Sequence, residues 1–239
     1  MALTIKLKSS NEVAAGTTAF HFEKPPRFTF TPGQAGDFSL TNPPQTDKEG
    51  DKRSFSLASA PYESDLIFAT RMRDTAFKRS LETIPLGTEF ALDAPWGELT
   101  LHEDTSIPAV FLTGGIGITP VRSIVLQATR DKLDQTLVLF YSNRRPEDAA
   151  FLDELKQAEK DNPNFTLVAT MTKLADSSRP WQGETGLIDP AMLKRHLKDI
   201  TVPIYYISGP PEMVDAMQKM LSSAGVKSKN IRAEEFSGY

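Results

Sequence analysis

The chain has 239 residues, of which 39% are hydrophobic and 24% charged, and its formal net charge is −4. This length suits one large domain or two of ordinary size, and the charge argues against a general nucleic-acid binder. Cysteine is absent, which excludes disulfides, thiolate zinc sites, cysteine nucleophiles and cysteine-bound iron–sulfur clusters within this chain. Any redox group must therefore be an organic cofactor.

No apolar run approaches the roughly 18 residues that cross a membrane, so we expect no membrane span. The N-terminus does not read as a signal peptide, because Lys6 and Lys8 interrupt its apolar positions. His21, His102 and His196 are too scattered in the sequence to suggest a metal site. We therefore expect a cytoplasmic protein without a bound metal.

Short runs of alternating apolar and polar residues extend to about residue 103, which is the pattern of β-strands. We expect strands at 18–22, 27–30, 66–69 and 89–92, with proline and glycine turns between them. A helical pattern at 74–84, capped by Asp74 or Thr75, interrupts the series, and the polar residues 42–52 suit a long loop. Many short strands separated by turns predict a small antiparallel barrel.

From residue 105 the pattern changes to an alternation of strand and helix. We expect strands at about 107–113, 136–142, 165–171, 203–208 and 230–236. Helices are expected between them, near 120–130, 147–160, 190–198 and 211–224. Alternating strands and helices predict an open parallel sheet covered on both faces. The chain is thus expected to divide into residues 1–103 and 104–239.

A glycine-rich turn, T-G-G-I-G-I-T-P at 113–120, joins the first strand of this second half to its first helix. Thr119 is expected to act as the N-cap, with Pro120 as the first helical residue. Glycines let the backbone approach a bulky anion, and the first turn of a helix offers unpaired N–H groups. The turn therefore predicts binding of a nucleotide phosphate, although a purely structural turn is the alternative.

The ordinary dinucleotide fingerprint G-x-G-x-x-G fits this turn poorly. Gly115 and Gly117 begin the pattern, but Pro120 stands where the third glycine belongs. No Asp or Glu follows the second strand to bind a ribose, and the residues there are S-N-R-R at 142–145. A different kind of nucleotide domain is expected.

Three motifs along the chain indicate which kind of nucleotide domain this is. They are R-S-F-S at 53–56, G-G-I-G-I-T-P at 114–120 and S-G-P-P-E-M-V at 208–214. Together they resemble the ferredoxin–NADP⁺ reductase superfamily, whose motifs read R-x-Y-S, G-G-x-G-x-T-P and C-G-P-x-x-M-V. Phe55 replaces the tyrosine and Ser208 the cysteine. The resemblance covers nearly the whole chain and implies a flavin-binding antiparallel β-barrel followed by an α/β nucleotide domain with a doubly wound parallel sheet.

The resemblance also implies how a flavin is held. Arg53 would bind the diphosphate, Phe55 would stack on a flat ring, and Ser56 would hydrogen-bond to the flavin ring. The start of the helix at 74–80 would meet the diphosphate, so FAD is favoured over FMN. The other flavin contacts implied are Ser54, Arg71, Thr75, Ala76, Phe77 and Thr119. Lys78 and Arg79 are interpreted as solvated helix charges.

The C-terminal residues carry a further implication of the resemblance, since this family often covers the flavin with its terminal segment. Phe236 or Tyr239 is the expected cover, and Glu235 the expected proton partner near the reduced ring. A strand residue followed by a frayed end is the alternative. With Ser56 and with Ser208, which would lie near the nicotinamide, Glu235 completes the expected catalytic set.

The nicotinamide nucleotide is expected at the glycine turn and the strand end at 208–210. The implied contacts are Gly114, Gly115, Gly117, Thr119, Pro120, Gly209 and Pro210. Arg144 and Arg145, in the absence of a ribose-binding acid, favour a 2′-phosphate and hence NADPH over NADH. Lys173 and Arg179, after the third strand, form a second candidate pocket for that phosphate.

The leading hypothesis is an NAD(P)H-dependent flavoprotein reductase in which hydride passes to flavin and electrons then pass to a separate acceptor. Ferredoxin or flavodoxin is the expected acceptor, and a free flavin, a ferric chelate or an oxygenase partner is the alternative. A different class of function is a non-catalytic flavin-binding redox sensor or electron-transfer subunit. We expect a monomer.

Overall fold

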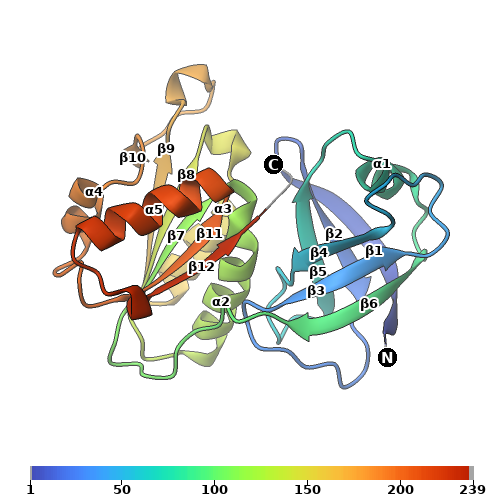
Figure 1. The fold of residues 1–239 in the computed structure, drawn as a ribbon, viewed down its shortest axis with the longest axis horizontal. Helices are drawn as coiled ribbons and strands as arrows, with labels where there is room; N and C mark the ends of the chain where they lie inside the picture. The colour runs from blue at the N-terminus through green and yellow to red at the C-terminus, as the bar shows by residue number, and fades with distance from the viewer. Residues whose placement is uncertain (1, 237–239) are drawn as a thin grey trace.

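The computed structural model describes residues 2–236, which form two six-stranded sheets side by side (Figure 1). The first sheet is antiparallel, in the order β4-β3-β6-β1-β2-β5. The second sheet is parallel, in the order β10-β9-β8-β7-β11-β12, with helices on both faces. The predicted fold class is confirmed.

The first sheet wraps round an aromatic core. Phe22, Phe38, Phe68 and Phe90 are fully buried there, each from a different strand. Its elements are β1 (Leu3–Ala14), β2 (Thr17–Glu23), β3 (Ala35–Leu40), β4 (Lys52–Ser56), β5 (Asp65–Arg71), α1 (Ala76–Thr83) and β6 (Glu89–Trp96). Within the described residues no backbone ladder joins β4 to β5, the two ends of the sheet order.

The strand predicted at 27–30 is wrong. Arg27 has a left-handed backbone with φ 67°, and the Phe28 N–H donates to the Pro25 carbonyl in a turn. Phe30 is nevertheless buried and packs against the barrel core. Its side chain is therefore buried by a turn rather than by a strand, which explains the misleading apolar pattern.

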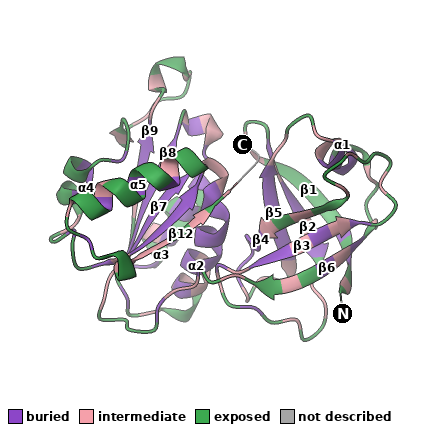
Figure 2. Ribbon diagram, in the orientation of Figure 1, coloured by how far each residue is buried: buried purple, intermediate pink, exposed green. Residues whose placement is uncertain are grey.

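The second sheet is buried from both sides, and every residue of its strand β7 is buried (Figure 2). α2 and α3 pack on one face, with α2 also facing the barrel, and α4 and α5 pack on the other (Figure 1). The strands are β7 (Ala109–Gly114), β8 (Leu137–Asn143), β9 (Phe165–Met171), β10 (Glu184–Thr185), β11 (Ile204–Gly209) and β12 (Ile231–Glu235). The helices are α2 (Ile118–Asp131), α3 (Leu152–Asp161), α4 (Pro190–His196) and α5 (Pro211–Ser223).

Two predicted helix starts need correction. The residues 115–117 form a 3₁₀ turn and α2 begins at Ile118, so Thr119 and Pro120 lie inside the first helical turn. Thr119 is not the N-cap: its Oγ1 donates to the Ile116 carbonyl at 3.1 Å. The helix expected at 147–160 begins only at Leu152, because Phe151 adopts a left-handed backbone with φ 58°.

One buried cation joins the two halves of the molecule. Arg122 of α2 is 4% exposed and forms ion pairs with Glu63, which precedes β5, at 2.9 Å, and with Glu154 of α3 at 2.7 Å. Its guanidinium also donates to the Ala58 carbonyl and lies over the Phe151 ring, 4.9 Å from the centroid. The positions of α2 and the barrel relative to each other are thereby fixed.

None of the helices within residues 2–236 combines the length and apolarity that crossing a bilayer requires.

Candidate functional site

A cavity of 460 Å³ lies where the barrel meets the start of α2. Most of the residues expected to contact a flavin line it. They are Arg53, Ser54, Phe55, Ser56, Arg71, Thr75, Thr119 and Phe236. We call this the barrel cavity. It gathers residues that are up to 187 positions apart in sequence, because the loop before β4, β4 itself, β5, α1, the glycine turn and the end of β12 all meet there.

Ser56 ends β4 and is buried against the cavity. Its Oγ has no hydrogen-bond partner within residues 2–236. A buried hydroxyl left unpaired costs roughly 1–3 kcal/mol, so the polypeptide alone does not explain a serine at this position. Ser54, two residues earlier, is already used, because its Oγ donates to the Asp37 carboxylate at 2.6 Å. The Ser56 Oγ is therefore an unpaired, buried polar atom beside this cavity.

The Phe55 ring lies parallel to the Phe68 ring, with centroids 4.2 Å apart. One face of Phe55 is thus committed to the barrel core, where the stack joins β4 to β5. The ring is only partly buried and still contributes to the cavity wall. Phe77, also expected at the flavin, is instead a core residue, 1% exposed, beneath the Arg53 guanidinium.

Arg53 is held by the loop between β3 and β4. Its guanidinium donates to the carbonyls of Glu49, Gly50 and Lys52 and to the Glu49 carboxylate at 3.1 Å. An ion pair with Asp47 at 3.5 Å completes the set. Asp47 also accepts a hydrogen bond from the Ala76 N–H at the start of α1. The Asp47 carboxylate therefore contacts both groups that were expected to hold a diphosphate, the Arg53 guanidinium and the start of α1.

The sequence suggested that Lys78 is a solvated helix charge, and this prediction is wrong. It lines the barrel cavity, and its ammonium donates to the Arg71 carbonyl at 2.7 Å. Desolvation, followed by the charges of Arg73 and Arg53, lowers the pKa of Lys78 to about 8. Its position one turn after the capping residue Thr75 is the signal that identifies it, since both lie on one face of α1.

A second cavity, of 640 Å³, opens at the carboxyl ends of β7, β8 and β9. Gly114, Gly115, Arg144 and Pro210 line it, as expected for the nucleotide. We call this the sheet-edge cavity. Sequence reasoning missed Asn143, whose buried Nδ2 has no hydrogen-bond partner within the described chain. It also missed an apolar wall from Leu187, Ile188, Met213 and Met217.

Backbone packing accounts for Gly117, and Gly114 lies close to the Met213 side chain, whereas Gly115 adopts a left-handed backbone with φ 51°. A Cβ on Gly117 would lie 2.3 Å from the Ser208 carbonyl oxygen, and one on Gly114 would lie 2.4 Å from the Met213 sulfur. Ser208 itself is fully buried, and its Oγ donates to the Gly117 carbonyl at 2.7 Å. Ser208 is not among the residues that line either cavity. Its hydroxyl therefore joins β11 to the turn.

The basic residues expected to bind a 2′-phosphate do not all line the same cavity. Arg144 and Lys173 are exposed and line a small cavity of 170 Å³ together with Arg71. Arg145 lies there too but is engaged by Asp148, which accepts from its Nε and NH2 at 2.9 and 2.8 Å. These hydrogen bonds raise the pKa of Arg145 above its usual range.

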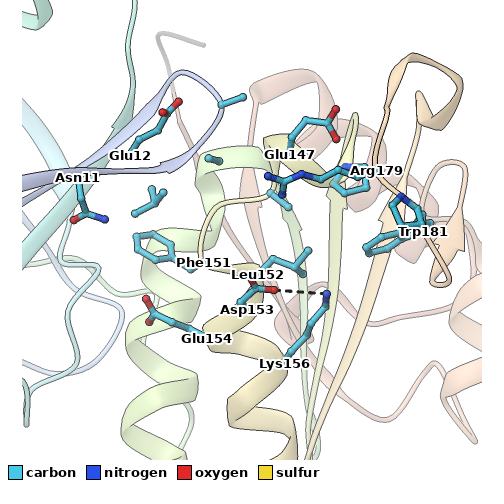
Figure 3. Close-up of a pocket in the computed structure, with 16 residues that line it drawn as sticks. Asn11, Glu12, Glu147, Phe151, Leu152, Asp153, Glu154, Lys156, Arg179 and Trp181 are labelled. Carbon is cyan, nitrogen blue, oxygen red and sulfur yellow. Dashed lines mark ion pairs between the residues drawn. The ribbon is translucent and has the colours of Figure 1, made fainter.

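Arg179 lies elsewhere. It lines a cavity of 790 Å³ between the end of β1 and α3, where Phe151, Lys156 and Trp181 are also found (Figure 3). Because that cavity shares none of its lining residues with the cavity beside Arg144, Arg179 is separated from the other expected phosphate contacts.

The end of the described chain returns to the barrel cavity. The Phe236 N–H donates to the Gly209 carbonyl at 2.9 Å, and the residue lines the cavity. Glu235 is exposed and does not line it. The neighbouring Glu234 is half-buried, and burial raises its pKa. Tyr239, the other expected cover, lies outside the described residues.

Comparison with known proteins finds sequence similarity over both halves of the chain. The family model described as oxidoreductase NAD-binding domain matches residues 111–219. The reductase component of propane 2-monooxygenase from Mycolicibacterium smegmatis is 29% identical over 218 residues, covering 89% of this chain and 61% of the relative. One subunit of the Na⁺-translocating NADH-quinone reductase of Pseudomonas aeruginosa is 31% identical, covering 84% of this chain and 48% of the relative. The chain thus spans about half to three-fifths of these relatives.

Two solved structures match almost end to end and show the same fold. A ferredoxin NADP⁺ reductase from Neisseria gonorrhoeae, determined with FAD and NADP bound, has a TM-score of 0.79 at 22% identity, with 98% of each chain covered. The FAD/NAD-binding domain of nitric oxide dioxygenase from Vibrio cholerae has a TM-score of 0.82 at 19% identity, again with 98% of each chain covered. Both likenesses include the two sheets described above.

Proposed function

We propose that this chain is a member of the ferredoxin–NADP⁺ reductase superfamily and an NAD(P)H-dependent flavin oxidoreductase that passes electrons to a separate acceptor. One observation carries this proposal. The glycine turn separates two cavities, with Gly114 and Gly115 lining the sheet-edge cavity and Ile116 and Thr119 lining the barrel cavity. A nucleotide in the first and a flavin in the second would meet at this turn.

The barrel cavity fits a flavin. The Ser56 hydroxyl has a free donor and acceptor for the polar edge of the ring, and the partly exposed Phe55 offers an apolar wall. Arg53 and the first N–H groups of α1 supply positive charge and donors for a diphosphate. When bound, a flavin accepts a hydride from a nicotinamide and releases electrons one at a time.

The sheet-edge cavity fits a nicotinamide nucleotide. The free Asn143 amide can donate to a carbonyl or phosphate oxygen, and the apolar wall at Met213 and Met217 suits an aromatic base. Arg71 lines both cavities, so it can contact the phosphates of either ligand. Thr119 lines the barrel cavity, and the hydrogen bond from its Oγ1 to the Ile116 carbonyl holds its side chain at the turn between the two cavities.

NADPH is the proposed reductant. Arg144 and Lys173 are exposed, form no ion pair within the described residues and line the same small cavity. A guanidinium and an ammonium close together favour a phosphate. Arg145 contributes less, because Asp148 already neutralises it.

The proposed acceptor is a separate redox carrier or oxygenase partner. Relatives of this chain are reductase components of propane 2-monooxygenase and terephthalate 1,2-dioxygenase. These 239 residues contain no cysteine with which to bind an iron–sulfur cluster, so any such cluster that accepts electrons from the flavin lies outside them. A ferredoxin or flavodoxin fits that requirement.

The test is a visible spectrum of the purified protein, before and after FAD is added, followed by anaerobic mixing with NADPH and NADH. We expect FAD to bind and NADPH to bleach its absorbance. Arg53→Ala should weaken FAD binding at least about tenfold, while Arg130→Ala, an exposed cation on α2, should not. A protein that takes up no FAD would refute the proposal. Bound FAD that neither nucleotide bleaches would favour a redox sensor instead.

A further inference from the structure

The loop between β3 and β4, residues 41–51, packs against α1 as well as against Arg53. Gln45 accepts hydrogen bonds from Arg79 Nε at 2.7 Å and from Ser80 Oγ, both on α1. Asp47 reaches the start of the same helix, where its Oδ2 accepts from the Ala76 N–H at 3.2 Å. The loop therefore covers the helix terminus that faces the barrel cavity.

The Asp47 carboxylate lies between a helix N-terminus and an arginine, where an anion could also bind. Its Oδ2 accepts from the Ala76 N–H, and its Oδ1 accepts from the Glu49 N–H at 2.9 Å and lies 3.5 Å from the Arg53 guanidinium. Backbone N–H groups at a helix start together with a guanidinium form the donor set that a phosphate prefers. Glu49 adds a second carboxylate on Arg53. The chain's own acidic side chains thus contact those donors.

We propose that Asp47 is an internal competitor for the diphosphate subsite, so that FAD binds only by displacing this carboxylate, and Asp47 thereby sets flavin affinity and its dependence on phosphate. This inference rests on the proposed flavin binding. A diphosphate carries more negative charge than one carboxylate and offers more acceptor atoms, so it can replace Asp47 at both donors. A flavin without phosphate gains nothing from that exchange.

The competition predicts that loss of the Asp47 charge affects ligands that carry phosphate and leaves phosphate-free ligands unaffected. Asp47→Asn removes the competing charge but keeps an oxygen for the Ala76 N–H. It should tighten FAD and inorganic pyrophosphate by about tenfold, while riboflavin affinity stays unchanged. Asp51→Asn is the matched control, because Asp51 is exposed in the same loop and its carboxylate has no partner within residues 2–236. It should bind all three ligands as the natural chain does.

Isothermal titration of the flavin-free protein with the three ligands measures these affinities, and limited trypsin digestion supplies a second measurement. Lys48 is exposed within the loop. Displacement of Asp47 by FAD or pyrophosphate should release the loop and accelerate cleavage after Lys48, whereas riboflavin should not. Asp47→Asn should be cleaved faster without any ligand.

The outcomes separate this inference from the proposed function. Equal FAD and pyrophosphate affinities in Asp47→Asn and the natural chain would refute the competition even if FAD binds well. Equal tightening of riboflavin would refute it too, because the effect would then lie outside the diphosphate subsite. If no flavin binds to any variant, the proposed function fails. The pyrophosphate titration then still decides whether Asp47 competes with an anion.

Discussion

The Phe55 ring of β4 stacks on the Phe68 ring of β5 with an angle of only 4° between their planes. These strands are the two ends of the first sheet, and no backbone ladder connects them within the described residues. An aromatic stack therefore contributes to closing the barrel next to the proposed flavin cavity. Such pairs add about 0.5–1.5 kcal/mol beyond the area they bury.

Phe55→Ala should lower the free energy of unfolding of the flavin-free protein by about 2–3 kcal/mol, because it removes this stack and part of the core. Urea unfolding followed by circular dichroism measures the loss. Leu86→Ala, at a side chain 65% exposed, is the control and should change stability by less than about 0.5 kcal/mol. Equal losses in the two variants would mean that the stack does not hold the strands together.

Ser56→Ala should weaken flavin binding by about tenfold or more while leaving the flavin-free protein as stable as before, or slightly more stable. The reason is that the Ser56 Oγ has no partner in the described chain. Ser59→Ala is the matched control, because the buried Ser59 Oγ accepts from the Ile67 N–H at 3.1 Å and its loss should cost about 1–3 kcal/mol. A stability loss in Ser56→Ala similar to that of Ser59→Ala would assign Ser56 a structural role.

Arg144→Ala should raise the KM for NADPH about tenfold and leave the KM for NADH nearly unchanged, since only NADPH carries a 2′-phosphate. Steady-state kinetics with an artificial acceptor measures both constants. Arg179→Ala is the control and should alter neither, because Arg179 lines a different cavity. A parallel rise for both nucleotides would show that Arg144 does not read the 2′-phosphate.

Lys78 should make stability depend on pH. Its folded pKa is about 8, against an ordinary value of 10.5. Between these values the unfolded chain binds more protons than the folded chain, so the free energy of unfolding rises with pH over that range. Urea unfolding of the flavin-free protein at pH 7.5 and 9.5 tests this.

Lys78→Met should remove the contribution of Lys78 to the rise of the unfolding free energy with pH. Lys194→Met, at an exposed position on α4, is the matched control. The same lysine should also link FAD binding to pH, because its charge faces the barrel cavity below about pH 8. FAD affinity should therefore fall as pH rises through that value, and less so in Lys78→Met. An identical pH profile in this variant and the natural chain would contradict the assignment.

The sequence predicted the architecture because both halves carry strong periodic patterns. The strand β9 matches its predicted range, 165–171, residue for residue. The predicted strand at 27–30 failed because a turn buries Phe30 as well as a strand would. The N-cap at Thr119 failed because Pro120 is tolerated anywhere in a first helical turn, so it does not locate the helix start.

The candidate site was predictable in its motifs but not in its contacts. Arg53 and Ser56 come to one cavity as expected, yet the carboxylate of Asp47 beside Arg53 depends on how a polar loop folds back over α1. The role of Ser208 differs for a similar reason. Only the close approach of β11 to the glycine turn, fixed by tertiary packing, places its hydroxyl against Gly117 rather than a cavity.

The buried Arg122 affects how the protein unfolds. Its carboxylate partners come from both halves, and one continuous hydrophobic cluster includes Ile67 of the barrel and Val121 of α2. Separating the sheets would expose that cluster and break the Arg122–Glu63 ion pair, so that only Glu154 would remain beside the guanidinium, which is unfavourable. The two sheets should therefore melt as a single cooperative unit, giving one calorimetric transition rather than two.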